Sequence, residues 1–144
     1  MAERCIDASV VLKLAFKGEP YRIAARRLIS DSLMQGIALI APAFFESEVD
    51  SVIRKRTFDG RLSLAEGRRA YSALDRVPIR TVSLPNLRNQ ARLLAESLNQ
   101  ASVYDSTYAA LAQLRGCEFW TADLQFYRAA VPLLAFVKYL PDYS

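Results

Sequence analysis

The hydrophobic positions of the chain form short continuous runs, separated by longer stretches in which apolar residues recur at helical spacing. A short apolar run bounded by turn signals is typical of a strand that is buried on both faces. The runs stand at regular intervals along the chain, which is typical of an alternation of strands and helices. The predicted strands are 4–7, 37–41, 79–82, a run between Gly116 and Asp123, and 133–137.

The stretches with helical spacing carry the residues expected at helix ends. Gly18 ends a first helix and Pro20 opens the second, while Pro42 lies in the predicted first turn of the third. Ser63 and Glu66 form a capping-box pattern at the start of the fourth. The predicted helices are 8–16, 20–35, 42–58, 63–76, 85 to about 98, one that begins near 102, and a last one that begins near 123.

This alternation predicts an α/β fold, with a parallel sheet between two layers of helices. A length of 144 residues is that of one domain, and a hydrophobic fraction of 52% supplies a substantial core. No apolar run reaches the roughly 18 residues that a membrane span requires. The N-terminal segment MAERCIDAS has no apolar signal region. We therefore expect a single domain over residues 1–144, in the cytoplasm and outside any membrane.

The residue types present restrict the chemistry. The chain has no histidine, which excludes Ser-His and Cys-His catalysis and zinc bound by histidine. Cys5 and Cys117 each lie in or beside an apolar strand, so we expect reduced, buried thiols rather than a disulfide. An enzyme with this composition must work with carboxylates, hydroxyls, lysine, arginine or a hard metal ion.

Carboxylates stand where the strands of the predicted sheet end. Asp7 and Asp123 each follow a strand, and ligands of parallel α/β folds bind at that edge. Asp105 lies in the first turn of a predicted helix that starts at the same edge. The third helix offers Glu46 and Glu48, which flank its buried face on opposite sides, so periodicity does not choose between them.

Each acid also has a structural interpretation. Asp7 can cap the helix that follows it, and Asp123 or Thr121 can cap the last helix. Asp105 stands three residues after Ser102, a spacing similar to a capping box. The glutamates can be solvated positions on a helix flank.

Their common location favours a metal site. Four converging carboxylates would repel one another and raise one another's pKa unless a cation were present. Ligation by oxygen alone selects Mg²⁺ or Mn²⁺, which activates bound water and stabilises a phosphodiester during attack. Ser9 and Thr121 can orient a carboxylate or a metal-bound water, or cap a helix. With four acids in one pocket, 19 basic and 11 acidic residues remain elsewhere, a balance of +8 that suits a polyanion substrate.

At these residues the sequence resembles the PIN-domain family, specifically its VapC-type ribonuclease toxins. The family's strand followed by D-x-S/T stands here as Ile6-Asp7-Ala8-Ser9, and its helical E-V-x-x-V/L-x-R/K element as the segment from Glu48 to Arg54. The Y-D-x-x-Y-x-A-L-A and T-A-D elements begin at Tyr104 and Thr121. Ser51 is a departure, since many relatives have asparagine after the glutamate. The resemblance covers nearly the whole chain and selects Glu48 over Glu46.

The resemblance implies a single three-layer α/β/α domain with a central, mostly parallel five-stranded sheet. It also implies that the protein is a homodimer, that it cleaves RNA with Mg²⁺ or Mn²⁺, and that a small antitoxin inhibits it through a C-terminal segment. The residues that the resemblance assigns to the metal and to catalysis are Asp7, Glu48, Asp105 and Asp123.

The leading hypothesis is thus a metal-dependent endoribonuclease that acts as a toxin. Arg54, Lys55 and Arg56, near the end of the third helix, are the candidates for contacts with the RNA backbone. Two alternatives remain open. One is a PIN nuclease of RNA processing, which a neighbouring antitoxin gene would argue against. The other is a PIN-like RNA-binding module without catalysis. Four carboxylates that repel one another argue against it, because a module that only binds RNA does not need them.

Overall fold

Five short strands form one sheet in the order β3-β2-β1-β4-β5, and every neighbouring pair is parallel. The first strand in the sequence is therefore the central one. The computed structural model describes residues 2–144. The predicted five-stranded sheet in an α/β fold is confirmed. The strands are β1 (Glu3–Ile6), β2 (Ala38–Pro42), β3 (Ile79–Val82), β4 (Glu118–Thr121) and β5 (Val137–Tyr139).

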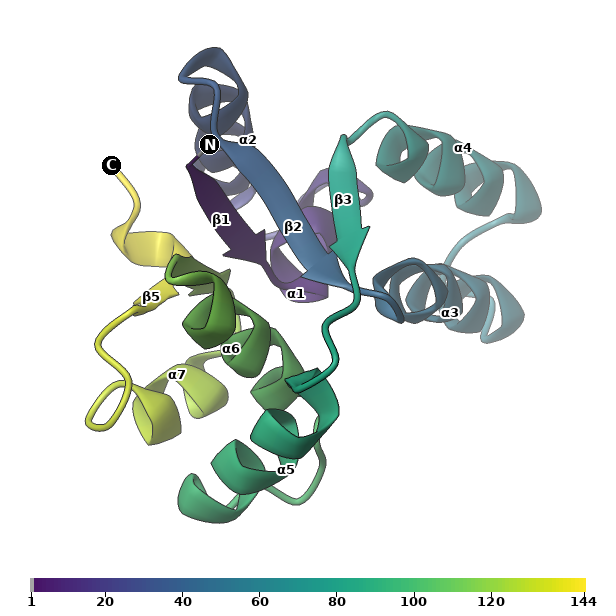
Figure 1. The fold of residues 1–144 in the computed structure, drawn as a ribbon. Helices are drawn as coiled ribbons and strands as arrows, with labels where there is room; N and C mark the ends of the chain where they lie inside the picture. The colour runs from purple at the N-terminus through teal and green to yellow at the C-terminus, as the bar shows by residue number, and fades with distance from the viewer. Residues whose placement is uncertain (1) are drawn as a thin grey trace.

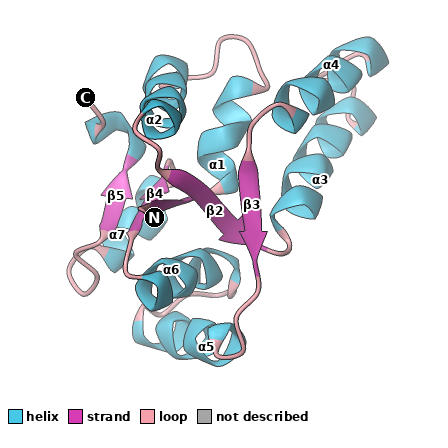
Figure 2. Ribbon diagram, turned by 45° about the horizontal axis from the view of Figure 1, so that its top comes forward, coloured by secondary structure: helices cyan, strands magenta, loops and turns pink. Residues whose placement is uncertain are grey.

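Helices cover both faces of this sheet (Figures 1 and 2). In Figure 2, α1 and α2 lie above the sheet, and α5 and α6 lie below it, while α3 and α4 pack against each other beyond β3. The helices are α1 (Ala8–Val11), α2 (Arg22–Met34), α3 (Phe45–Phe58), α4 (Leu64–Asp75), α5 (Leu87–Ser97), α6 (Tyr104–Arg115) and α7 (Leu124–Ala130), with short 3-10 turns at Leu12–Leu14 and Leu140–Asp142. None of the helices described within residues 2–144 is both long and apolar enough to cross a membrane.

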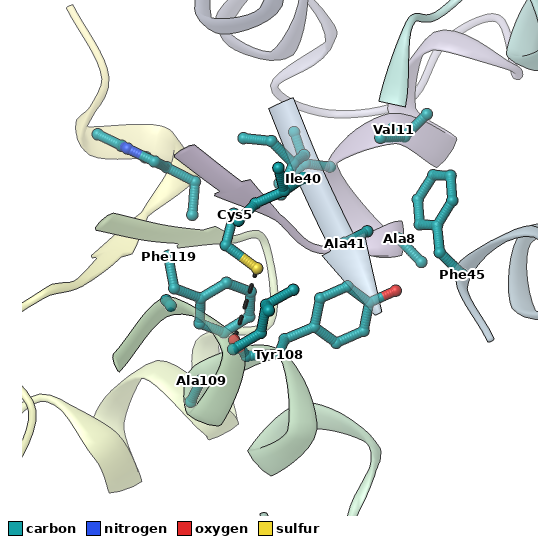
Figure 3. Close-up of a cluster of buried hydrophobic side chains, with 14 of the residues drawn as sticks. Cys5, Ala8, Val11, Ile40, Ala41, Phe45, Tyr108, Ala109 and Phe119 are labelled. Atoms are coloured by element: carbon teal, nitrogen blue, oxygen red, sulfur yellow. Dashed lines mark hydrogen bonds between the residues drawn. The ribbon is translucent and has the colours of Figure 1, made fainter. Parts of the chain in front are cut away.

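Aromatic side chains fill the core between α6 and the sheet. The ring of Tyr108 stacks on that of Phe119 with 5.6 Å between centroids, and Phe126 meets Phe119 edge to face. All three side chains are fully buried or nearly so. Figure 3 shows Cys5 in this cluster, where its Sγ donates to the main-chain oxygen of Tyr108 at 3.5 Å. Cys5 is buried and Cys117 half-buried, and both are free thiols, in agreement with the sequence prediction.

Several element boundaries differ from the sequence prediction. Pro42 does not open α3 but ends β2, where it pairs with Val82 of β3. The pairing of β2 with β1 ends at Ile40, before Pro42. Because proline lacks an N–H, it is tolerated here, where no hydrogen bond to β1 is needed. The predicted strand 133–137 is also wrong, because β5 begins at Val137. Leu134 instead donates its N–H to Ala130, continuing the turn after α7.

The predicted first helix is also shorter than expected, since regular α-helix ends at Val11 and a 3-10 turn follows. The capping box of α4 is confirmed. The Ser63 hydroxyl accepts from the main-chain N–H of Glu66, and the Glu66 carboxylate accepts from that of Ser63.

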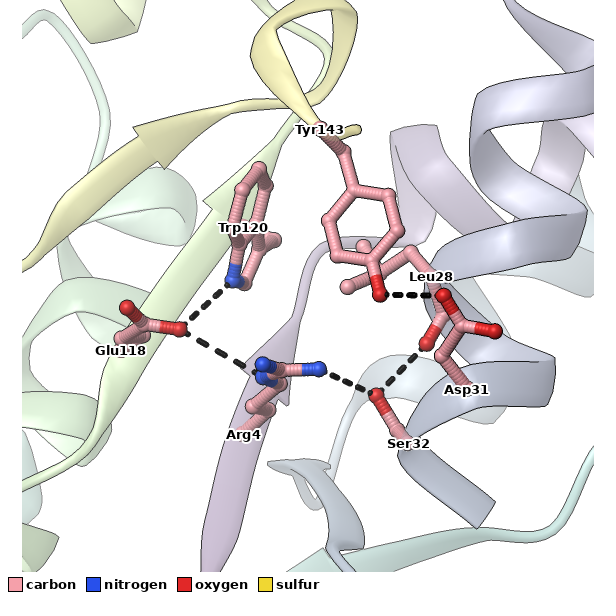
Figure 4. A network of polar contacts seen from close by, with 7 residues as sticks. All are labelled: Arg4, Leu28, Asp31, Ser32, Glu118, Trp120 and Tyr143. Atoms are coloured by element: carbon pink, nitrogen blue, oxygen red, sulfur yellow. Dashed lines mark hydrogen bonds and ion pairs between the residues drawn. The ribbon is translucent and has the colours of Figure 1, made fainter. Parts of the chain in front are cut away.

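A polar network ties the end of the chain to the amino end of the sheet (Figure 4). Arg4 on β1 donates to Ser32 on α2 at 2.8 Å and pairs with Glu118 on β4 at 3.4 Å. The Tyr143 hydroxyl donates to Asp31 on α2 at 2.7 Å. These contacts hold β1, β4, α2 and the last residues together at one edge of the sheet and leave the opposite, carboxyl edge to the acids.

Candidate metal centre

Four carboxylates are placed around the carboxyl edge of the sheet by four different elements. Asp7 follows β1 and Asp123 follows β4, and because these two strands are parallel neighbours their ends meet. Glu48 lies in the first turn of α3 and Asp105 in the first turn of α6. The structure thus places at one edge of the sheet the four acids that the family motifs selected.

Asp7 is the most enclosed of the four, with 4% of its surface exposed. The hydroxyls of Ser9 and Thr121 donate to the same oxygen, Oδ2, at 2.9 and 2.7 Å. Its side chain makes no cap hydrogen bond to α1, so the capping interpretation does not hold for it. Burial raises the pKa of Asp7, the two hydroxyl hydrogen bonds oppose that rise, and the charge of Asp123 adds to it.

Ser9 and Thr121 also fix the turn after β4. The Ser9 Oγ accepts from the N–H of Ala122, and the Thr121 Oγ1 accepts from the N–H of Asp123, both at 3.0 Å. Asp123 caps α7, since its Oδ1 accepts from the N–H of Phe126 at 3.0 Å. The capping interpretation therefore holds for Asp123. This cap uses only Oδ1 of Asp123. The hydrogen bonds described here leave Oδ1 of Asp7 and Oδ2 of Asp123 unused.

Glu48 and Glu46 have different environments. Glu48 is half-buried and accepts a hydrogen bond of 2.6 Å from the Tyr108 hydroxyl, whereas Glu46 is exposed. Burial raises the pKa of Glu48, the Tyr108 hydrogen bond opposes this, and the charge of Asp7 adds to it. Sequence reasoning did not assign Tyr108 to the site. The signal for it was its position three residues after Asp105, on the same face of one helix.

Asp105 does not cap α6, whose first residue is Tyr104 and whose N-cap is Val103, without a side-chain cap bond. The resemblance to a capping box with Ser102 is therefore wrong. Burial is the main cause that raises the pKa of Asp105 from 3.8 to about 7, followed by the charges of Asp7, Asp123 and Glu48. Asp105 is thus electrostatically coupled to all three other acids.

The raised pKa values of these carboxylates indicate whether the site suits a cation. Carboxylates that raise one another's pKa are stabilised by a positive charge between them, and their oxygens suit a hard divalent ion. In the arrangement described for residues 2–144, however, no three potential ligand side chains stand close enough together to hold one metal ion. The donor chemistry fits Mg²⁺ or Mn²⁺, and metal binding requires the carboxylates to approach one another.

The three basic candidates of α3 lie away from the acids. Lys55 is seven residues beyond Glu48, which corresponds to about 10 Å along a helix. Arg54 and Lys55 are exposed. Arg56 is engaged elsewhere, because it pairs with Glu19 at 3.4 Å and its guanidinium lies 3.9 Å from the ring centroid of Phe16. Arg56 is thus held by structural contacts. Arg54 lies over the ring of Phe58, and among the ion pairs of residues 2–144 neither Arg54 nor Lys55 has a partner.

Comparison with known proteins identifies the family of the chain. The family model described as PIN domain matches residues 4–132. The chain is 31% identical over 101 residues to VapC ribonuclease Mb0985 of Mycobacterium bovis, which is 70% of this chain and 73% of that protein. The same values hold for Ribonuclease VapC9 of Mycobacterium tuberculosis.

Two solved structures share the fold. PAE2754 from Pyrobaculum aerophilum superposes with a TM-score of 0.66 at 18% identity, over 97% of this chain and 92% of that one. VapC20 from Mycobacterium tuberculosis, described as a sarcin–ricin loop cleaving toxin, superposes with a TM-score of 0.63 at 18% identity, over 88% of this chain and 95% of its own. Because the PIN-domain model matches residues 4–132 and two VapC ribonucleases are 31% identical to the chain over 101 aligned residues, this protein belongs to the PIN-domain family, in its VapC-type branch.

Proposed function

We propose that this protein is a metal-dependent endoribonuclease that hydrolyses phosphodiester bonds of RNA and acts as the toxin of a toxin–antitoxin pair. The observation that carries the proposal is the position of four acids, each from a different element, at one edge of the sheet, where the charges of Asp7, Asp123 and Glu48 help to raise the pKa of Asp105. The names of the curated relatives, which are ribonucleases, and the description of VapC20 as a toxin support the same function.

The four acids would hold Mg²⁺ or Mn²⁺, which when bound supplies an activated water and neutralises charge on the scissile phosphate. The chain's own residues prepare this site. Ser9 and Thr121 fix Asp7 through Oδ2, and Tyr108 orients Glu48. Burial of Asp7 at the floor of the site keeps bulk water from its carboxylate.

A cleavage assay tests the nuclease directly. Purified protein should cleave cellular RNA in the presence of Mg²⁺ or Mn²⁺, and cleavage should stop when EDTA is added. Glu48→Gln should lose cleavage, and Glu46→Gln is the matched control that should retain it, because Glu46 is exposed and outside the cluster. Full cleavage by Glu48→Gln, or by wild type in EDTA, would refute the metal-dependent mechanism.

The toxin role requires a means of inhibition. We propose a small antitoxin protein whose bound segment lies in a groove beside α3. A lysine or arginine of its bound segment would reach the acids and pair with carboxylates that otherwise hold metal. We also propose that the toxin is a homodimer in the cytoplasm, as the family resemblance implies.

Expression in cells separates this role from RNA processing. Expression of the protein alone should arrest growth, and co-expression of a small protein from the neighbouring gene should restore it. Asp7→Ala should be harmless, and the partner should still bind it, with lower affinity. Normal growth of the native host with high expression and the neighbouring gene deleted would refute the toxin role and favour the RNA-processing nuclease.

A further inference from the structure

A groove of about 560 Å³ lies between the ends of β2 and β3 and the first turns of α5 and α6. We call it the α5–α6 groove, and its lining includes Phe44, Leu84, Arg88, Arg92, Val103 and Tyr104. It adjoins the candidate metal centre, because Tyr104 directly precedes Asp105. The ring of Phe44 also contacts that of Tyr108, which binds Glu48.

The floor of the groove is aromatic and open to solvent. Tyr104 is 56% exposed and Val103 is 45% exposed, although both begin a helix whose later residues are buried in the core. The ring of Tyr104 meets that of Phe44 edge to face, with 5.3 Å between centroids. This contact fixes the Tyr104 ring and leaves more than half of its surface available for a planar ligand.

The rim of the groove is basic. Arg88 and Arg92 are four residues apart on α5, so they project from the same side of the helix, and both are exposed. Within residues 2–144 neither forms an ion pair, and no acidic side chain is among the groove's lining residues. Arg88 and Arg92 thus give the groove two arginines without an ion pair among residues 2–144, next to the four carboxylates of the candidate metal centre.

An aromatic floor with a basic rim is the combination that binds single-stranded nucleic acid. Any base can stack on an aromatic ring, while arginines contact the phosphates on either side. A base within a duplex is already stacked and does not present its face. The position next to the acids puts such a nucleotide beside the phosphate that the acids would act on.

We propose that the α5–α6 groove holds one unpaired nucleobase of the RNA, stacked on Tyr104, with Arg88 and Arg92 on the flanking phosphates. The inference rests on the proposed function, because it takes RNA as the ligand. It gives the protein a preference for single-stranded segments such as loops, with the cut placed next to the bound base.

Binding in EDTA tests this site without cleavage. Tyr104→Ala should weaken the binding of a short, fluorescently labelled single-stranded RNA by about 5- to 100-fold, the usual effect of losing one stacking ring. Tyr104→Phe should bind as wild type does. Phe58→Ala is the matched control, since Phe58 is an exposed aromatic residue beside Arg54 on the far end of α3. Equal affinity in wild type and Tyr104→Ala, or an equal loss in Phe58→Ala, would overturn the proposal.

A second arm locates the base. Removing one base at a time from the RNA should reveal one position whose loss weakens binding to wild type but not to Tyr104→Ala. Arg88→Ala with Arg92→Ala should lower the salt dependence of binding by about 1.4 in logarithmic slope, for two phosphate contacts. If no base position depends on Tyr104, the groove does not hold a base.

Two further measurements distinguish base binding from dimerisation and from catalysis. If Tyr104→Ala converts a dimer into a monomer in sedimentation, the groove is an interface between two copies of the chain and the base-binding proposal fails. Cleavage by wild type with and without EDTA tests the proposed function alone. A wild type that never cleaves but loses RNA affinity on Tyr104→Ala would refute the nuclease and keep the base-binding groove.

Discussion

Replacing Asp105 with asparagine should abolish cleavage and at the same time stabilise the metal-free fold. Burial and the charges of the other three acids raise the pKa of Asp105 from 3.8 to about 7. Between these two pH values the folded protein binds more protons than the unfolded chain, so its stability falls as pH rises. Above about pH 7 the full cost of the charge is present, and asparagine removes it.

The size of the effect follows from the shift. A rise of about three pKa units corresponds to about 4 kcal/mol for a fully shielded group. Asp105 is only half-buried, and solvent screening reduces this figure to about 1–2 kcal/mol. For a domain of this size, such a change raises the melting temperature of Asp105→Asn above that of wild type by about 3–6 °C at pH 8.

Thermal unfolding followed by circular dichroism measures this difference. In EDTA the two proteins should have similar stability near pH 4, and the variant should be more stable at pH 8. Excess Mg²⁺ should then stabilise wild type more than the variant, because at one Mg²⁺ concentration the protein that binds the ion more tightly gains more stability. Glu46→Gln is the control, since this exposed acid should show neither effect. A variant that is no more stable than wild type at pH 8, or that gains as much from Mg²⁺, would refute the reasoning.

The remaining predictions concern the Tyr108 hydroxyl beside Glu48, the packing of α4 against α3, and the cap of α4. Tyr108→Phe removes the hydroxyl that orients Glu48 and should slow cleavage about tenfold. The free energy of unfolding should change by only about 1 kcal/mol. Unchanged cleavage would show that Glu48 needs no orienting partner. A Cβ on Gly67 would stand 2.5 Å from the Oγ1 of Thr57, so Gly67→Ala should cost about 1–3 kcal/mol in urea unfolding, and Thr57→Ala should relieve most of it. No relief would place the strain elsewhere. Ser63→Ala should cost about 1 kcal/mol in the same assay, and an equal midpoint would show that the cap adds nothing.

The sequence predicts most of the fold because periodicity and turn residues report directly on burial. The apolar run at 133–137 shows where that signal fails. Leu134 and Val137 are both buried, as the run predicts, but burial alone does not specify conformation. The pairing of Phe119 with Val137 sets where β5 begins, and this register depends on a strand distant in sequence.

The site could be predicted in residue identity but not in detail. Glu46 and Glu48 flank the buried face of α3 equally, and the choice depends on where α6 packs, because Tyr108 of α6 holds Glu48. The double role of Asp123, which caps α7 and also adds charge to the site, is likewise visible only in three dimensions. Arg88 and Arg92 gave no signal beyond their spacing, since paired arginines on a helix are usually solvated.

The central position of β1 determines when the site can exist during translation. β1 is made before its two sheet neighbours, and one of them, β4, is made long after it. Asp7 and Asp123 are separated by 116 residues, so at ordinary rates of synthesis roughly 6 to 23 seconds pass between them. Throughout that interval the nascent chain lacks at least one of its four acids. An enzyme built in this order cannot attack RNA of the ribosome that is making it until Asp123 has been added and β4 has paired with β1.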